Sequence, residues 1–120
     1  MNVYTVQMGK YRLAIEKGIP FVDITVRSGI QAFAPTWPMV NRWKQNKISE
    51  DDYAALYRHK VLSEKWAFES DWKELLEYDT VALACYCKAH HFCHRLLLVD
   101  ILRDIHRNEN RPFDYLGELE

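Results

Sequence analysis

The sequence predicts an α/β fold: a small three-layer domain with a three- or four-stranded, mostly parallel sheet and flanking helices. One observation is the apolar run at residues 81–84, which suits a strand buried on both faces, and which a short loop and an amphipathic helix follow. The other is that strand and helix patterns alternate along the chain. At 120 residues, the chain is expected to form a single α/β domain over residues 1–120.

Four segments are expected to be extended. Three suit strands of the sheet, and the fourth, the C-terminal tail, is a candidate edge strand. In chain order they are residues 3–6, 21–26, 81–84 and 111–120. Ligands of parallel sheets bind at the carboxyl ends of the strands. We therefore expect three polar stretches to converge on one edge, and these are residues 7–10, 27–29 and 85–95.

The helices are predicted from caps and from apolar periodicity. Ser49 and Asp52 form a capping-box pattern, so a helix is expected to begin at Glu50. Its buried stripe is expected to contain Tyr53, Leu56, Tyr57 and Val61. Ser70 is expected to cap a shorter helix. The other predicted helices cover residues 11–17, about 37–45, and about 96–107.

Composition narrows the classes of function. Seventeen acidic and 16 basic residues give a net charge of -1, which does not point to nucleic acid or an anionic membrane, although nucleic acid is not excluded. No apolar run approaches about 20 residues, so no membrane span is expected. The N-terminus lacks the pattern of a secretory signal. Three clustered cysteines do not suit a disulfide framework, so the expected location is the cytoplasm.

The densest group of reactive side chains lies between the third strand and the last helix. All three cysteines and three of the five histidines fall within ten positions, and Arg95 follows at once. One interpretation is a metal site, because thiolates and imidazoles are zinc ligands. The set would be Cys87, Cys93 and His91. The C-x-C spacing is shorter than the usual C-x2-C, so the cofactor stays unknown, with zinc as the candidate.

A second interpretation is a reactive thiol. Cys93 is expected at the beginning of the last helix, where free N–H groups and the helix dipole lower the pKa of a thiol. Cys93 or Cys87 would then act as a nucleophile. Asp23 is a further candidate nucleophile, for glycosidic-bond transfer. No partner acid or base can be assigned from the sequence.

A third interpretation is anion binding. A helix N-terminus with His94 and Arg95 in its first turn suits a phosphate, and polar residues after the first two strands could reach the same ligand. The ligand-binding candidates are therefore Lys10, Arg27, Ser28, His94 and Arg95. The structural alternative is that Arg27 and Arg95 form ordinary ion pairs with Asp23 or Asp100.

Residues 83–88 (Leu-Ala-Cys-Tyr-Cys-Lys) and 92–95 (Phe-Cys-His-Arg) resemble the hallmark of domain-of-unknown-function family 488. The resemblance covers most of the chain, with further matching segments at residues 3–9, 21–27, 33–37, 48–53 and 115–118. Those at 33–37 and 48–53 resemble a compact version found in phage and bacterial genomes. The resemblance implies a compact α/β domain without a settled activity. It directs attention to Asp23, Arg27, Cys87, Cys93, His94 and Arg95.

The leading hypothesis is a pocket, between the Arg27 turn and the beginning of the Cys93 helix, that binds a nucleotide-like or other phosphorylated small molecule. In a phage, such a protein could act as a sponge for a host signalling nucleotide. One alternative is an enzyme that uses a Cys thiolate or Asp23 on a nucleotide or nucleic-acid-derived substrate. Another is a zinc-stabilised interaction domain. Whether identical chains associate is left open.

Overall fold

Four parallel strands form one sheet in the order β2-β3-β1-β4. The computed structural model describes residues 1–120. Its strands are β1 (Asn2–Gln7), β2 (Phe21–Asp23), β3 (Thr80–Cys85) and β4 (Asp114–Leu119). The sheet confirms the predicted fold class, and the C-terminal tail is indeed an edge strand, paired with β1.

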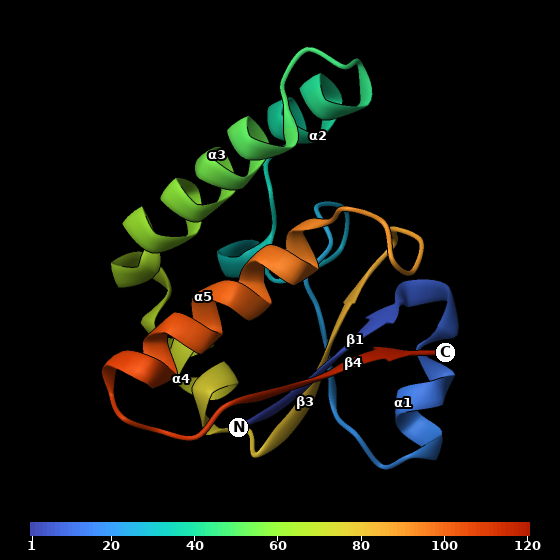
Figure 1. Ribbon diagram of the computed structural model, residues 1–120, viewed down its shortest axis with the longest axis vertical. Helices are drawn as coiled ribbons and strands as arrows, with labels where there is room; N and C mark the ends of the chain where they lie inside the picture. The colour runs from blue at the N-terminus through green and yellow to red at the C-terminus, as the bar shows by residue number, and fades with distance from the viewer.

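Helices cover both faces of the sheet and complete the three layers (Figure 1). On one face, α1 (Arg12–Glu16) packs through Ala14 against Ala82 and Ala84 of β3. On the other, Val81 and Leu83 join the large core formed with α3 (Glu50–Ser63), α4 (Glu69–Glu77) and α5 (His94–Asn108). Because successive side chains of β3 are buried on opposite faces of the sheet, residues 81–85 are all apolar. None of the helices combines the length and the apolar character needed to cross a bilayer.

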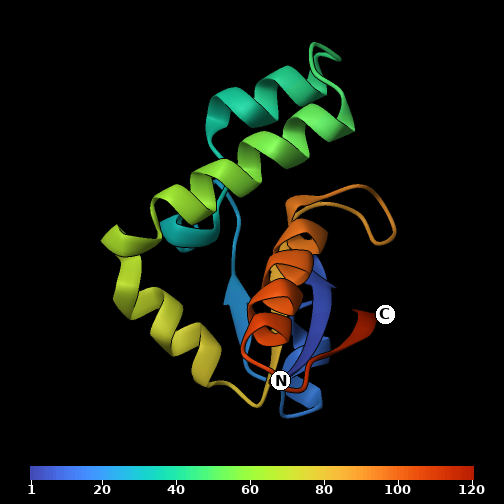
Figure 2. The same cartoon turned by 60° about the vertical axis from the view of Figure 1, so that its left-hand side comes forward.

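The helix α2 (Trp37–Lys44) lies alongside α3, and this pair stands over the upper end of the sheet (Figure 2). The capping box of α3 is present as predicted: Ser49 Oγ accepts from Asp52 N–H at 3.1 Å, and Asp52 Oδ2 accepts from Ser49 N–H at 3.2 Å. Three short 3-10 helices complete the elements: η1 (Met8–Lys10), η2 (Gln31–Phe33) and η3 (Lys65–Phe68).

Three local predictions are wrong. The second strand ends at Asp23 rather than at residue 26, because the Asp23 carboxylate takes the Thr25 N–H and turns the chain. Leu56 is 40% exposed and lies outside the buried stripe of α3. Ser70 lies inside α4, which begins at Glu69 with no side-chain cap.

The register of the sheet brings two loops together at its carboxyl edge. Asp23, at the end of β2, lies beside Ala84, and Cys85, at the end of β3, lies beside Gln7. The chain continues from β2 into residues 24–30 and from β3 into residues 86–93, here called the β2 loop and the β3 loop. Both loops therefore leave the sheet next to each other, on the side that α2 and α3 cover.

Candidate functional site

A pocket of about 330 Å³ opens between the two loops and the α2–α3 pair. Its lining is mostly apolar, with a wall of five aromatic side chains: Trp37, Trp43, Tyr53, Tyr86 and Phe92. Two cations, Arg27 of the β2 loop and Lys44 at the end of α2, lie in the same lining. Small-molecule sites commonly have this volume and this apolar character.

Phe92 holds the aromatic wall together. Its ring centroid lies 5.2 Å from that of Trp43 and 5.6 Å from that of Tyr53, both in tilted or edge-on geometry. Trp43 and Tyr53 also contact each other at 6.3 Å. Such offset arrangements are the favourable ones for aromatic pairs. These contacts therefore link the β3 loop to α2 and α3.

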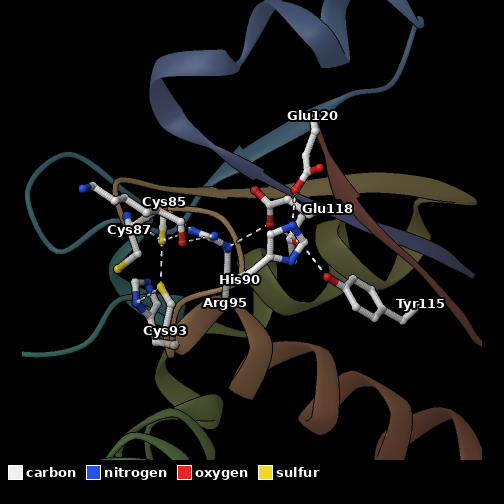
Figure 3. Close-up of polar contacts among 11 residues, drawn as sticks. Cys85, Cys87, His90, Cys93, Arg95, Tyr115, Glu118 and Glu120 are labelled. Atoms are coloured by element: carbon white, nitrogen blue, oxygen red, sulfur yellow. Dashed lines mark hydrogen bonds and ion pairs between the residues drawn. The ribbon is translucent and has the colours of Figure 1, made fainter.

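The three cysteines lie close together (Figure 3), and all of them line the pocket. Cys85 ends β3, Cys93 is the residue before α5, and their sulfurs lie 2.8 Å apart. Cys85 Sγ also accepts from Arg95 Nη1 at 2.9 Å and from the Cys87 N–H at 3.4 Å. Cys87 is the least buried of the three.

The cysteine protons are unequally distributed. Hydrogen bonds with Cys85 and then Cys93 lower the pKa of Cys87 to about 3, and the charges of Arg95 and Lys44 act in the same direction. Hydrogen bonds with Cys85 and then Cys87 raise the pKa of Cys93, and burial raises it further. The expectation that the helix N-terminus lowers the pKa of Cys93 is therefore wrong. Neighbouring thiols and burial outweigh the helix dipole there.

His94, the first residue of α5, is held from two sides. Its Nε2 lies 2.6 Å from the Ile24 carbonyl oxygen of the β2 loop, and its Nδ1 lies 3.5 Å from Cys93 Sγ. The ring packs against Tyr57 with centroids 5.6 Å apart. Burial lowers the pKa of His94, which favours the neutral ring.

Arg95 lies beneath the pocket. Only 1% of the residue is exposed, and its guanidinium donates to the carbonyl oxygens of Cys87 (2.8 Å) and Lys88 (3.0 Å). On its other side, Arg95 Nε lies 3.2 Å from Glu118 Oε1 of β4 (Figure 3). Thr5 donates to the same Glu118 oxygen at 2.6 Å. Arg95 thus joins the β3 loop to a buried carboxylate on the far strand.

Sequence comparison identifies the family of the chain. A family model described as the active DUF488-N3 subclade matches residues 6–106, a stretch that contains the whole pocket lining. The chain belongs to the DUF488-N3a family. This confirms the resemblance seen in the Cys-x-Cys and Cys-His-Arg segments. No curated protein and no solved structure is significantly similar to the chain.

The structure brings together only part of the predicted DUF488-N3a site. The predicted residues that line the pocket are Arg27, Cys87, Cys93 and His94. Lys10, Ser28 and His91 are exposed and lie outside the lining. The side chains placed for metal binding are Cys85, Cys93 and His94, and not the set with Cys87 and His91.

The two ion pairs offered as the structural alternative are absent. Asp23 does not contact Arg27: its Oδ1 accepts from Thr25 N–H at 2.9 Å and its Oδ2 from Ser28 Oγ at 2.7 Å. The ion-pair partner of Arg95 is Glu118, and Asp100 pairs instead with Arg103. Asp23 therefore shapes the β2 loop and leaves Arg27 free at the pocket.

Sequence reasoning missed two charged residues of this DUF488-N3a site. One is Lys44, which follows Trp43 at the C-terminal end of α2. The sequence signal for this residue was a cation directly after an aromatic residue in a predicted helix. Glu118 had no local signal. It meets Arg95 only because β4 pairs with β1 at the carboxyl edge, 23 positions along the chain from Arg95.

Proposed function

We propose that this DUF488-N3a protein binds a nucleotide-like molecule in its aromatic pocket. One observation carries the proposal: a wall of aromatic rings and two cations, Arg27 and Lys44, border the same 330 Å³ space. A planar base gains from stacking on aromatic side chains, and a phosphate gains from arginine and lysine. Apolar, acidic or purely sugar-like ligands would use only one of these two features.

The arrangement of the charged residues around the pocket also favours a ligand with an anionic group. Arg27 comes from the β2 loop and Lys44 from α2, so the two cations approach from different elements. No carboxylate lines the pocket, so neither cation is neutralised within it. An anionic group between them would be held without competition from the protein's own acids.

Fluorescence titration tests the proposal directly, because Trp37 and Trp43 line the pocket. The four common ribonucleoside monophosphates, and the matching nucleosides without phosphate, are titrated into the protein. We expect quenching by at least one monophosphate and clearly weaker binding of its nucleoside. Arg27→Met and Lys44→Met should each weaken binding about 10- to 100-fold, the value of a charge-assisted hydrogen bond.

Arg42→Met and Lys47→Met are the matched controls. Both residues are exposed cations on or just after α2, and neither lines the pocket. They should leave the affinity for the monophosphate unchanged. Equal effects in the two pairs of variants would mean that binding is only a general charge effect, and the proposal would fail.

The fate of the bound molecule separates two roles. Native mass spectrometry of gently purified protein detects a molecule held without turnover, as a sponge for a signalling nucleotide requires. Release of an unmodified phosphorylated molecule on denaturation supports that role. A bare polypeptide mass excludes a tight-binding sponge that is loaded in the expression host.

An enzyme acting on the same class of molecule, or on a nucleic-acid-derived one, is the second candidate. The description of the DUF488-N3a subclade as active favours it, as does the position of Cys87, whose thiol shares the pocket with the two cations. We expect the protein to change the mass of the nucleotide that it binds. Cys87→Ser should abolish that change and spare binding, whereas full conversion by Cys87→Ser would remove the thiol mechanism.

A further inference from the structure

Three metal-ligating side chains converge at the floor of the pocket. Cys85 Sγ, Cys93 Sγ and a ring nitrogen of His94 all lie within 4.8 Å of one another, and all three residues are buried. They come from both ends of the β3 loop: Cys85 closes β3, while Cys93 and His94 begin α5. Two thiolates and one imidazole are a ligand set that zinc prefers.

The hydrogen bonds of His94 leave the correct nitrogen for a metal. The Ile24 carbonyl oxygen can only accept, so the His94 Nε2 that lies 2.6 Å from it carries the proton. Nδ1 then keeps its lone pair, and this atom lies 3.5 Å from Cys93 Sγ. Metal-ligating histidines are typically oriented by a backbone carbonyl in this way.

Two hydrogen-bond donors suit a coordinated thiolate at Cys85. Cys85 Sγ accepts from Arg95 Nη1 at 2.9 Å and from the Cys87 N–H at 3.4 Å, and such N–H donors stabilise a metal-bound sulfur. Two thiolates neutralise one Zn²⁺, and Arg95 is already paired with Glu118 at 3.2 Å. The buried charges would therefore balance with the ion in place.

From this geometry we infer that Cys85, Cys93 and His94 bind a zinc ion whose fourth coordination position faces the aromatic pocket. All three residues line that pocket, so a ligand or a water molecule inside the pocket can reach the fourth coordination position. Three protein ligands and one open position are the pattern of catalytic zinc sites, whereas structural sites have four protein ligands. The inference does not depend on the nature of the pocket's ligand.

Zinc binding requires a small local movement. The two sulfurs are 2.8 Å apart, whereas two sulfurs bound tetrahedrally at about 2.3 Å from zinc lie about 3.8 Å apart. Rotation of the Cys85 and Cys93 side chains provides the separation. The same short distance also allows a rival state, a Cys85–Cys93 disulfide, formed when a peroxide accepts the two electrons and two protons of the thiols and becomes water.

Metal analysis and cobalt spectroscopy test the site. The protein is produced in zinc-supplemented medium, purified without chelators, and analysed for metal; we expect about one zinc per chain. After removal of zinc and full reduction, Co²⁺ should give strong visible bands of a tetrahedral site and a thiolate charge-transfer band sized for two Co–S bonds. Fewer than about 0.1 zinc per chain, together with no charge-transfer band, overturns the inference. Because the protein is fully reduced before Co²⁺ is added, oxidation of the thiols does not explain that result.

Variants locate the ion and test the open position. His94→Ala and Cys93→Ser should lose zinc, while His91→Ala, which changes an exposed histidine of the same loop, should retain it. Cys87→Ser should also retain zinc, and loss of zinc from this variant would overturn the open position by making Cys87 the fourth ligand. If the ligand variants do not fold, the cobalt spectrum of the unaltered chain decides alone. A chain that binds nucleotides but no cobalt refutes this inference and leaves the proposed function intact.

Discussion

The two loops that border the pocket are held in place by different means. The β2 loop is fixed by its own residues: Asp23 accepts from Thr25 N–H and Ser28 Oγ, and the Gly29 N–H donates to the Thr25 carbonyl at 3.0 Å. The β3 loop is held from outside, by an Arg95 guanidinium that donates to its carbonyl oxygens. The β2 loop is therefore shaped mainly from within, with one contact from His94 to the Ile24 carbonyl oxygen. The β3 loop has few internal hydrogen bonds and depends more on Arg95.

This difference separates the two tasks of the site. The β2 loop presents Arg27 and the Ile24 carbonyl oxygen, and their positions depend mainly on hydrogen bonds within residues 23–29. The externally held loop carries Cys87 and Phe92, and its shape depends on the pair between Arg95 and Glu118. Substitution of Arg95 or Glu118 should therefore disturb the β3 loop and leave the β2 loop unchanged. Four substitutions test this contrast, from the largest expected effect to the smallest.

Arg95→Met should have the largest effect. It removes the donor to the β3 loop and leaves the Glu118 side chain, only 5% exposed, without its counter-charge. We expect the free energy of unfolding to fall by about 3–5 kcal/mol, measured by urea denaturation. Arg103→Met is the matched control, because its pair with Asp100 is largely solvated and should contribute less than about 1 kcal/mol.

A second change separates charge from packing in this prediction. Glu118→Gln in the Arg95→Met background removes the unpaired carboxylate, and it should restore at least about 1 kcal/mol of the lost stability. No restoration would mean that Arg95 stabilises the protein through its contacts with the β3 loop alone. A single-variant loss below about 1 kcal/mol would contradict the external support described for this loop.

Gly29→Ala should damage the β2 loop. A Cβ at Gly29 would lie 2.4 Å from Thr25 N and 2.5 Å from Thr25 O, both backbone atoms that cannot rotate away. We expect a loss of about 1–3 kcal/mol in thermal or chemical unfolding, as for other overpacked positions. At Gly9 nothing lies within 4 Å of an added Cβ, so Gly9→Ala should stay within about 0.5 kcal/mol.

Asp23→Asn should weaken the same loop more mildly. The amide keeps the shape of the carboxylate but loses the charge that strengthens its hydrogen bonds with Thr25 and Ser28. The expected cost is about 1 kcal/mol of unfolding free energy. Asp114→Asn, at an exposed carboxylate with no side-chain partner, should have no measurable effect; equal losses in the two variants would count against the loop's self-support.

Arg27→Met should be the mildest change for stability. Arg27 is exposed and makes no hydrogen bond or ion pair with its side chain, so unfolding should shift by less than about 0.5 kcal/mol. Its effect should appear only in nucleotide affinity. A stability loss above about 1 kcal/mol would show that the β2 loop needs Arg27 to hold its shape.

Features encoded by neighbouring residues could be predicted from the sequence. The apolar run of β3, the helix after the cysteine-rich loop, and the Ser49–Asp52 capping box all depend on residues close in the chain. The convergence of the loops after β2 and β3 also followed, because parallel strands place their carboxyl ends on one edge.

Long-range pairing could not be predicted. The structural alternative to phosphate binding paired Arg95 with Asp23 or Asp100, whereas its partner Glu118 reaches it through the pairing of β4 with β1. The pKa of Cys93 follows from thiols brought within hydrogen-bond distance by folding, and not from its place at a helix terminus. Likewise, the place of His94, and not His91, beside the sulfurs of Cys85 and Cys93 is set by the folded chain.

The sheet order has a consequence for how the chain folds. β1 begins at Asn2, yet both of its partners lie late in the sequence, β3 from Thr80 and β4 from Asp114. During synthesis the first strand therefore waits unpaired until most of the chain has left the ribosome. Contacts of such long sequence separation slow folding, and an apolar strand exposed in the meantime is prone to pair with other chains. The N-terminal strand thus gains its first partner only when β3 has been made.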